Sequence, residues 1–380
     1  MSGATEARLG SSGIIDFIKK IPLMTVLIGG LLVLFLILAH FSGLSIPTEM
    51  TFIIQRFTYW SVLVLAMVPA IQSGTGPNFA LPVGICAGLL AMVVVMEMQL
   101  MGAAFITVSI LIAIGIAALF GLGYGILMNA VKGSEMAIAT YTGFSMTALF
   151  SMIWLVYPIT NKDIGFFLGP GLRIIVNLDT FASNKILENL WSFNLDFGWL
   201  YRLFEGTWLV RSIPSETAIA VPTGTLLLFA FFATMVYLFF RSKTGVAISA
   251  VGMNPVFAKA TGINVDRSRI IANVMSTCLG AVGIIVYAQG FGFAQFYDMP
   301  MLMAFPAVAA VLVGGATAQR SKVMNVIIGC FLFQGLLTIA PPVFGRLLQD
   351  ADADITNPVR LIVQFGVILY ALTKMSGGAK

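Results

Sequence analysis

The side chains that could perform chemistry are few and widely spaced in this chain. There is a single histidine, His40, and the three cysteines, Cys86, Cys278 and Cys330, all lie in apolar runs. A metal site needs several ligands at a characteristic spacing, and a general base needs a polar partner, and His40 has neither nearby. The cysteines are typical of small buried residues, not of a disulfide framework. No catalytic residue and no metal ligand are therefore predicted, and the chain is not expected to be an enzyme by itself.

A glycine-rich stretch at 73–84, SGTGPNFALPVG, contains a Gly-x-Gly that could suggest a phosphate-binding loop. No strand precedes it, no lysine follows it, and the GxxxxGK[ST] pattern is absent from the chain, so nucleotide binding is not predicted. The stretch is either a simple helix break or a break whose freed backbone groups line the path of a solute. In the second case Gln72 and Asn78 could offer hydrogen bonds to a polar solute.

Acidic residues at two places could bind a cation or carry a proton. Glu97 is the only acid well inside an expected membrane span, but it lies near the outer end of that span, where an interfacial position is favoured. The run DADAD at 350–354 lacks the glycine and the distal glutamate of an EF-hand loop. We interpret it as a solvated outer loop.

The elements that must position these residues belong to a membrane protein, because the chain is too apolar to be soluble. Of its 380 residues 59% are hydrophobic and only 10% are charged, and the mean hydropathy is +0.97. A soluble domain typically has about 25% charged residues. Apolar runs recur along the whole length, which argues against a signal peptide followed by a soluble domain. The net charge of +5 indicates basic cytoplasmic loops and no nucleic-acid surface.

Ten stretches are candidates for membrane-spanning helices, each of which needs about 20 largely apolar residues. They are 22–40, 53–71, 80–98, 103–130, 136–159, 219–240, 270–291, 302–316, 323–343 and 357–374. The third and the eighth are the weakest, because glycine and proline interrupt or flank them. The fold class expected is an all-α integral membrane protein with about ten transmembrane helices.

The distribution of lysine and arginine orients these helices. Short loops rich in basic residues lie in the cytoplasm, and an even number of spans places both termini there. The predicted organisation is a cytoplasmic segment at 1–21, a transmembrane domain at 22–374 and a cytoplasmic tail at 375–380. Within the domain, 160–218 is a long extracytoplasmic segment and 241–269 is a cytoplasmic loop.

The order of the spans also suggests an internal repeat. Spans two to five and spans seven to ten each form four consecutive helices, and each set has an interrupted second member. The first set enters from outside and the second from inside, so the two would be inverted four-helix repeats with broken second helices. Inverted repeats with interrupted helices at matching places point to a transport pathway between them.

The loop 241–269 contains a short, capped helix among positive charges. Asn254 and Pro255 form a helix start, and Gly262 is a helix stop. Between them Val256 and Phe257 are expected to be exposed on the cytoplasmic face. The charged residues of the loop are Arg241, Lys243, Lys259, Arg267, Arg269 and Asp266. From the residues alone, the loop either holds its cations against anionic lipid or docks the helix into a groove of a soluble partner.

The run GVAISAVGMNPVFAKATGINVDRSR at 245–269 resembles the coupling-helix signature of ABC-transporter permeases of the branched-chain amino acid and ribose (simple sugar) type. The positions that fit are Gly245, Ala250, Val251, Gly252, Asn254, Ala258, Gly262, Ile263, Asn264 and Val265. The apolar run AVAAVLVGG at 307–315 is similar to a second feature of that family. Two departures concern the solute: 73–84 lacks the acidic residue usual in the sugar permeases, and 160–218 is longer than expected.

The resemblance implies the permease subunit of an ATP-driven importer. The coupling residues would be Asn254, Pro255, Val256, Phe257, Lys259 and Gly262. Implied partners are ABC ATPase subunits, which bind ATP and Mg²⁺, a second permease copy or a homologous permease, an extracytoplasmic solute-binding protein and membrane lipid. The acids at 350–354 could alternatively meet basic residues of that binding protein. The chain itself is expected to bind no cofactor and no nucleic acid, and to lie in the cell (inner) membrane.

The solute expected is a small neutral polar molecule, with a simple sugar first and a nucleoside second. Candidate residues of its pathway are Gln72, Asn78, Phe79, Gln289 and Gln334. The alternative is a secondary transporter or channel that works without ATP. Such a transporter needs ionisable residues deep in the spans, and apart from Glu97 none is expected there, which counts against it.

Overall fold

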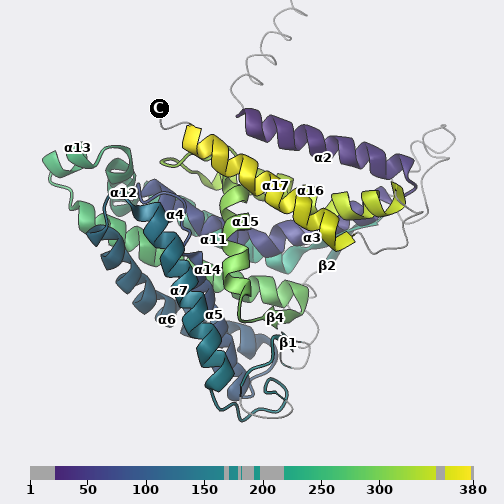
Figure 1. The fold of residues 1–380 in the computed structure, drawn as a ribbon, viewed down its shortest axis with the longest axis horizontal. Helices are drawn as coiled ribbons and strands as arrows, with labels where there is room; N and C mark the ends of the chain where they lie inside the picture. Colours follow the sequence, from purple (N-terminus) through teal and green to yellow (C-terminus); the bar gives the residue numbers. More distant parts are fainter. Residues whose placement is uncertain are drawn as a thin grey trace, which may run out of the picture.

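The structure, a computed structural model, describes residues 22–166, 171–178, 181, 192–196, 218–347 and 356–377. Within these ranges seven helices are long and apolar enough to cross a membrane, and three shorter apolar helices accompany them. Together they match the ten expected spans one by one, which confirms the predicted fold class (Figure 1). The segments 1–21 and 350–354 lie outside the described residues.

The elements follow each other in this order. The first part holds α2 (Leu23–Phe41), α3 (Ile46–Leu65), α4 (Met67–Gln72), α5 (Leu81–Glu97), α6 (Gly102–Ala130) and α7 (Glu135–Val156). The segment between α7 and α11, called the outer segment after its expected location, contains β1 (Ile175–Asn177), β2 (Ser192–Asp196) and β3 (Ala218–Pro222). The second part holds α11 (Thr223–Arg241), α12 (Lys243–Met253), α13 (Pro255–Ala260), α14 (Val265–Phe291), β4 (Phe293–Gln295), α15 (Met299–Val313), α16 (Val323–Leu347) and α17 (Thr356–Gly377).

Several expected boundaries differ from the structure, and two helix starts differ most. The second span, expected at 53–71, begins at Ile46 and is divided into α3 and α4 at Ala66. The seventh, expected at 270–291, begins at Val265, so that its first turn belongs to the segment 241–269 that was expected to be a loop. In addition, hydropathy did not predict two small antiparallel strand pairs, β1 with β4 and β2 with β3. Strand β3 takes the first residues of the sixth span, expected at 219–240, so that its helix begins only at Thr223.

The two sets of four helices correspond element by element. The helical stretch Ile46–Gln72 and the helix α14 each contain 27 residues. Each is followed by a non-helical segment and a short helix, α5 or α15, and then by two further helices. The packing is exchanged between the sets, because α3 packs on α16 while α14 packs on α6. This exchange is the pattern that an approximate two-fold relation produces.

The breaks that precede α5 and α15 lie at opposite ends of the bundle (Figure 1). The segment 73–80 contacts α12, since a Cβ added at Gly74 would lie 2.9 Å from the Cα of Gly252. The segment 292–298 instead contains β4, which pairs with β1 of the outer segment. The two sets therefore run in opposite directions, as the repeat interpretation expected. Within each set the break comes before the second helix, and α5 and α15 are themselves continuous.

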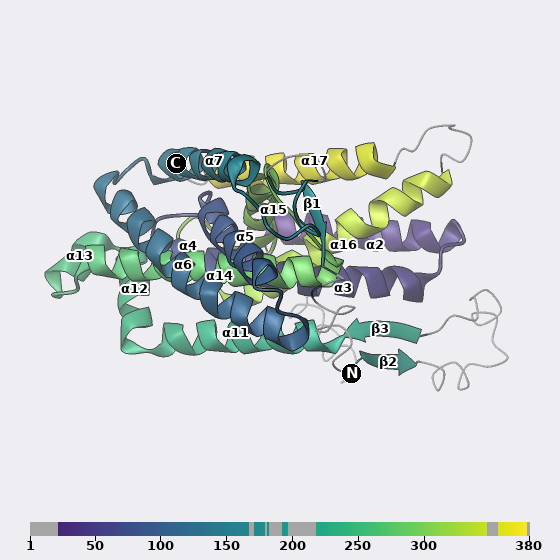
Figure 2. The same ribbon diagram turned by 90° about the horizontal axis from the view of Figure 1, so that it is seen from below.

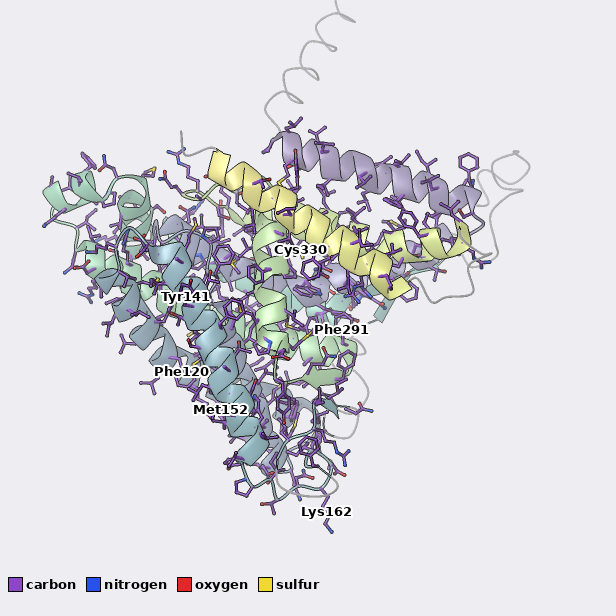
Figure 3. All side chains as sticks on the ribbon, in the orientation of Figure 1. Phe120, Tyr141, Met152, Lys162, Phe291 and Cys330 are labelled. Atoms are coloured by element: carbon purple, nitrogen blue, oxygen red, sulfur yellow. The ribbon has the colours of Figure 1, made fainter. Side chains whose placement is uncertain are left out.

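The core lies along α5, α14 and α15, where glycines let helix backbones touch. An added Cβ at Gly84 or Gly88 would lie 2.4 Å from the carbonyl oxygen of Thr277 or Ala281 in α14. In lipid, where helices gain little from hydrophobic burial, such close van der Waals packing is a main source of association. By contrast α2, α6, α7 and α11 expose large apolar side chains outward, as Met152 on α7 shows (Figure 3).

Candidate coupling helix and solute pathway

The short helix α13 forms where the cap residues predict it. The Asn254 side chain accepts a hydrogen bond from the Phe257 backbone N–H at 3.0 Å, and Pro255 occupies the first helical position. Asparagine at this cap satisfies one donor of the first turn, and proline there has no donor to leave unpaired. The structure therefore confirms the predicted helix start at Asn254.

The other end of α13 closes in a Schellman motif. Gly262 has a φ of +83°, a region that glycine enters without steric cost. Its N–H donates to the Lys259 carbonyl at 3.1 Å, and the Ile263 N–H donates to the Ala258 carbonyl at 3.0 Å. A six-residue helix is marginal alone, and these caps at both ends define its shape.

The apolar tip of α13 points away from the protein. Val256 is 79% exposed and Phe257 is 62% exposed, whereas Ala258 is fully buried. Lys259 is also exposed. The helix forms a projecting corner of the molecule next to α12 (Figure 1). An exposed valine and phenylalanine beside a cation form a contact surface suited to the groove of another protein.

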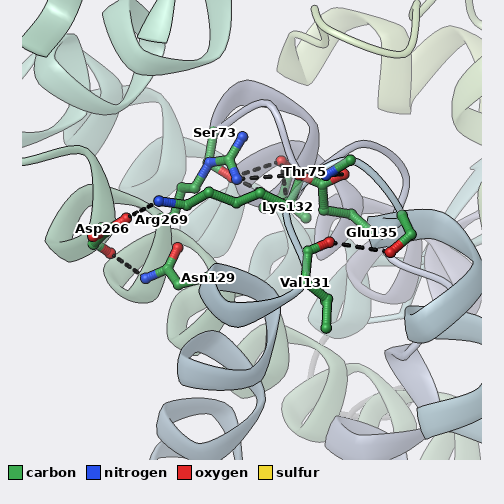
Figure 4. A network of polar contacts seen from close by, with 11 residues as sticks. Ser73, Thr75, Asn129, Val131, Lys132, Glu135, Asp266 and Arg269 are labelled. Carbon is green, nitrogen blue, oxygen red and sulfur yellow. Dashed lines mark hydrogen bonds and ion pairs between the residues drawn. The ribbon is translucent and has the colours of Figure 1, made fainter.

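Two ion pairs hold the base of this loop to the connection between α6 and α7 (Figure 4). Lys132 Nζ lies 2.6 Å from Asp266 Oδ1, with both side chains more than half exposed. Arg269 Nη1 lies 3.1 Å from Glu135 Oε1, and these side chains are only 8% and 16% exposed. The Glu135 carboxylate also accepts a hydrogen bond from the Gly133 N–H at 2.9 Å. The pairs tie the start of α14 to the start of α7.

A groove of about 980 Å³ separates α13 from this connection. Its lining carries charges of both signs, including Lys259 on α13, Glu135 on α7 and Asp266 on α14. The helix α13 is connected to the bundle through α12 at one end and α14 at the other, and its face with Val256 and Phe257 stays accessible.

The loop is in direct backbone contact with the break before α5. Gly252, near the end of α12, has no room for a side chain, because an added Cβ would lie 2.1 Å from the Gln72 carbonyl oxygen. On the other side, the Gln72 amide donates a hydrogen bond to the Ser321 carbonyl in the connection between α15 and α16. A displacement of α12 would therefore meet the end of α4 without an intervening flexible side chain.

Asn78, a candidate for the pathway, pins this break to the core. Its side-chain nitrogen donates to Ser276 Oγ at 2.8 Å, and its oxygen accepts from the Ala80 N–H at 3.0 Å. Ser276 in turn donates to the Ala66 carbonyl at 2.6 Å, where α3 and α4 divide. Asn78 is 2% exposed. In this conformation it links three elements and is directed into the protein.

The remaining pathway candidates are not brought together at one place. Phe79 packs against Phe305 of α15 with ring centroids 5.8 Å apart. Gln72 lies at the end of the bundle that touches α12, while Gln289 lies three residues from Gly292, at the end that touches the outer segment. Gln334 is in the middle of α16 and 1% exposed. Both of its amide atoms are buried without a partner among the described residues.

A charged cluster inside the bundle was missed by the sequence analysis. Arg56 lies eleven residues into the helix that starts at Ile46, and its Nη1 is buried without a partner among the described residues. Arg360 of α17 and Tyr287 of α14 lie close enough to interact with it electrostatically. The expectation that no ionisable residue apart from Glu97 lies deep in the spans was therefore wrong, because α3 starts seven residues earlier than hydropathy indicates and Arg56 lies farther from its end. The signal available in the sequence was Arg56 itself, the fourth residue of the span expected at 53–71.

Glu97 itself has a structural role at the end of α5. It is the last residue of α5, and its carboxylate accepts hydrogen bonds from the backbone N–H groups of Thr160 and Asn161 at 3.1 and 3.3 Å. It thus fastens the start of the outer segment to the end of α5. Cys86 and Cys330 are buried, as their apolar surroundings predict, whereas Cys278 is only partly buried.

The family model of the branched-chain amino acid transport system permease component matches residues 49–372. This range covers nearly the whole bundle, including α13 and both sets of four helices. The chain belongs to this permease family. The permease is thus a multi-pass membrane protein and a transport subunit of the ABC type.

Three named relatives are similar to parts of the permease. "Probable ABC transporter permease protein YphD" of Escherichia coli (strain K12) is 31% identical over 43% of the chain and 48% of its own length. The nucleoside ABC transporter permease protein NupB of Lactococcus lactis subsp. cremoris (strain MG1363) is 26% identical over 36% of each. The galactofuranose transporter permease protein YtfT of Escherichia coli (strain K12) is 27% identical over 68% of the chain and 75% of its own length. The chain thus spans half or less of the first two relatives.

Among solved structures, the permease resembles an ABC transporter described as metal-chelate type, in an inward-facing conformation. The two are 14% identical, with a TM-score of 0.44, and the similarity covers 91% of this chain and 99% of that chain.

Proposed function

We propose that this permease is the membrane-spanning subunit of an ATP-driven ABC importer for a small neutral polar solute. The observation that carries the proposal is α13, a capped helix whose apolar tip of Val256 and Phe257 is exposed at the end of the bundle. An ATPase subunit would receive this tip in a groove, and a second permease copy or a homologous permease would complete the pathway. ATP and Mg²⁺ would be bound by the ATPase.

In this mechanism α13 transmits movement to the solute pathway. Val256 and Phe257 would seat the helix in the ATPase, and Lys259 would orient it by charge. Because Gly252 touches the Gln72 carbonyl, a push on α13 and α12 would reach the break at 73–80 and the helix α5 behind it. The bundle would then alternate between outward-open and inward-open states. No bond is made or broken by the permease itself.

For the solute we propose a simple sugar first and a nucleoside second. Support comes from two relatives, which are named for galactofuranose and for nucleosides. Buried amides without partners among the described residues, such as those of Gln334, can bond to hydroxyl groups. Trp60 and Tyr287 pack edge to face at 5.4 Å beside Arg56 and add aromatic surface and hydrogen-bond donors. A solute-binding protein would deliver the solute at the outer face. The permease would lie in the cell (inner) membrane, with both of its termini in the cytoplasm.

The substitution Phe257→Asp tests the role of α13. We expect it to abolish uptake and the stimulation of ATP hydrolysis, because a carboxylate cannot enter an apolar groove without a large desolvation cost. The amount of permease inserted in the membrane should stay the same, since Phe257 is 62% exposed. Phe257→Leu is the matched control, which keeps the apolar contact and should keep most of the transport.

Normal uptake by Phe257→Asp would contradict the coupling role. Uptake in vesicles by the purified permease alone, without ATP, would favour the secondary transporter or channel instead.

A further inference from the structure

An apolar groove runs between α11 and the body of the bundle. It has a volume of about 800 Å³ and is lined by residues of α3 and α4, α11 and α16. Along α11 the lining extends from Leu226 to Arg241, about 22 Å at the rise of an α-helix. One leaflet contributes about 15 Å of hydrocarbon, so a lipid acyl chain fits along the groove. In Figure 2, α11 lies along one side of the bundle and leads directly into α12.

One end of this groove is polar and positively charged. Arg241 and Lys322 line it together with Gln72 and Ser321. Both cationic side chains are exposed, and the Arg241 guanidinium lies 4.6 Å from the centre of the Tyr237 ring, which holds it at the groove end. Among the described residues no salt bridge joins Arg241 or Lys322 to an acid. Two such cations beside a long apolar surface complement a molecule with an anionic head and a hydrocarbon tail.

Ser321 provides an independent observation at the same end. It is 1% exposed, and its hydroxyl has no hydrogen-bond partner among the described residues. A buried hydroxyl without a partner is costly, and an oxygen of a lipid headgroup would remove that cost. The backbone carbonyl of Ser321 is already occupied by the amide of Gln72.

We infer that this groove binds an anionic phospholipid of the cytoplasmic leaflet, with its phosphate between Arg241 and Lys322 and an acyl chain along α11. Basic pockets between transmembrane helices on the cytoplasmic side are suited to anionic headgroups. The site adjoins the transmission path, because Gln72 touches both Ser321 and Gly252. The lipid would therefore stiffen the contact through which α12 reaches the break at 73–80.

The inference is tested by lipid retention. The full permease, purified with its associated subunits, is equilibrated with equal amounts of phosphatidylglycerol and phosphatidylcholine, and the lipid kept after washing is measured by native mass spectrometry. We expect phosphatidylglycerol to be retained preferentially. Each cation near a membrane surface gives about a five-fold preference for an anionic headgroup. The double substitution Arg241→Gln with Lys322→Gln should therefore reduce that retention by about 25-fold.

A matched control removes the same charge from the same side. Lys243→Gln with Arg267→Gln changes two exposed cations that do not line the groove, and it should retain phosphatidylglycerol like the unaltered permease. Ala230→Trp fills the apolar part from an exposed position and should lower the retention of both lipids.

Two results would overturn the inference. One is unchanged phosphatidylglycerol retention by the Arg241 and Lys322 double variant. The other is a disulfide between two copies of Ala230→Cys, formed with lipid excluded, which would assign the groove to a second copy of the permease.

Discussion

At the scale of single residues, burial separates two ion pairs that look alike in the sequence. Lys132 and Asp266 are more than half exposed, so water and salt screen their attraction. Arg269 and Glu135 are largely buried, and the Arg269 Nε has no partner among the described residues. A buried charge that loses its counter-charge is far costlier than an exposed one. The buried pair therefore sets the position of the loop that carries α13.

The substitution Glu135→Gln should destabilise the permease strongly. Glutamine preserves the shape and can still accept from the Gly133 N–H, but it leaves the Arg269 charge buried without its partner. We expect a loss of about 3–5 kcal/mol. Asp266→Asn, the matched control, should cost no more than about 1 kcal/mol. The Tm of each solubilised variant checks both expectations. Equal shifts in Tm for the two variants would contradict the difference in burial between the two ion pairs.

At the scale of elements, the contact between α5 and α14 depends on the absence of side chains. Gly84 and Gly88 place α5 against the backbone of α14, and Gly314 and Gly329 do the same for the ends of α15 and α16. Of the glycines at 121, 123 and 125 in α6, the first and the last approach α14, while Gly123 has open space around it. The glycine pattern thus includes both packing positions and positions that face outward.

The substitution Gly84→Ala should weaken this helix contact. The new methyl group would lie 2.4 Å from the Thr277 carbonyl oxygen, so the helices must separate. Overpacking of this kind costs about 1–3 kcal/mol. Gly123→Ala, also within a helix, meets no atom within 4 Å and should be neutral or stabilising by up to about 1 kcal/mol. The Tm of each purified variant gives the comparison, and a stable Gly84→Ala protein would argue against close contact of α5 and α14.

At the scale of the whole molecule, the inverted relation of the two sets gives the bundle two different ends. One end carries α12, α13 and the break at 73–80, and the other carries β1, β4 and the break at 292–298. Lys162 lies at the tip of the second end, far from α13 (Figures 1 and 3). In the proposed mechanism, a push on α13 would therefore have to cross the bundle to change access at the end that carries β1 and β4.

Cysteine labelling tests this arrangement of the two ends. Cys278→Ala provides the background, because Cys86 and Cys330 are buried and Cys278 is only partly so. Val256→Cys, at a position 79% exposed, should react with a membrane-impermeant maleimide only in inside-out vesicles. Lys162→Cys should react only from the outside of intact cells. Labelling of both positions from the same side would refute the inverted topology and the orientation.

The sequence by itself determined the membrane class, the ten helices and the capped helix α13. Hydropathy depends on each segment alone, and caps such as Asn254 and Gly262 act through atoms only a few residues away. The preference of an apolar segment for the membrane and the geometry of a capped turn can therefore be derived without knowing what packs against them. The correspondence of the two sets of helices was also visible in the order of the spans.

Only the tertiary structure decided where polar residues meet. Asn78 and Ser276 are 198 residues apart, and Glu135 and Arg269 are 134 apart, so no local pattern pairs them. Hydropathy placed Arg56 near the end of its span, because the first turns of α3 are polar and were not counted as part of the span. The strands β1 and β4 have three residues each and exist through their pairing. Contacts between distant segments, formed when the helices pack, fix these features, and the composition of a single segment does not contain them.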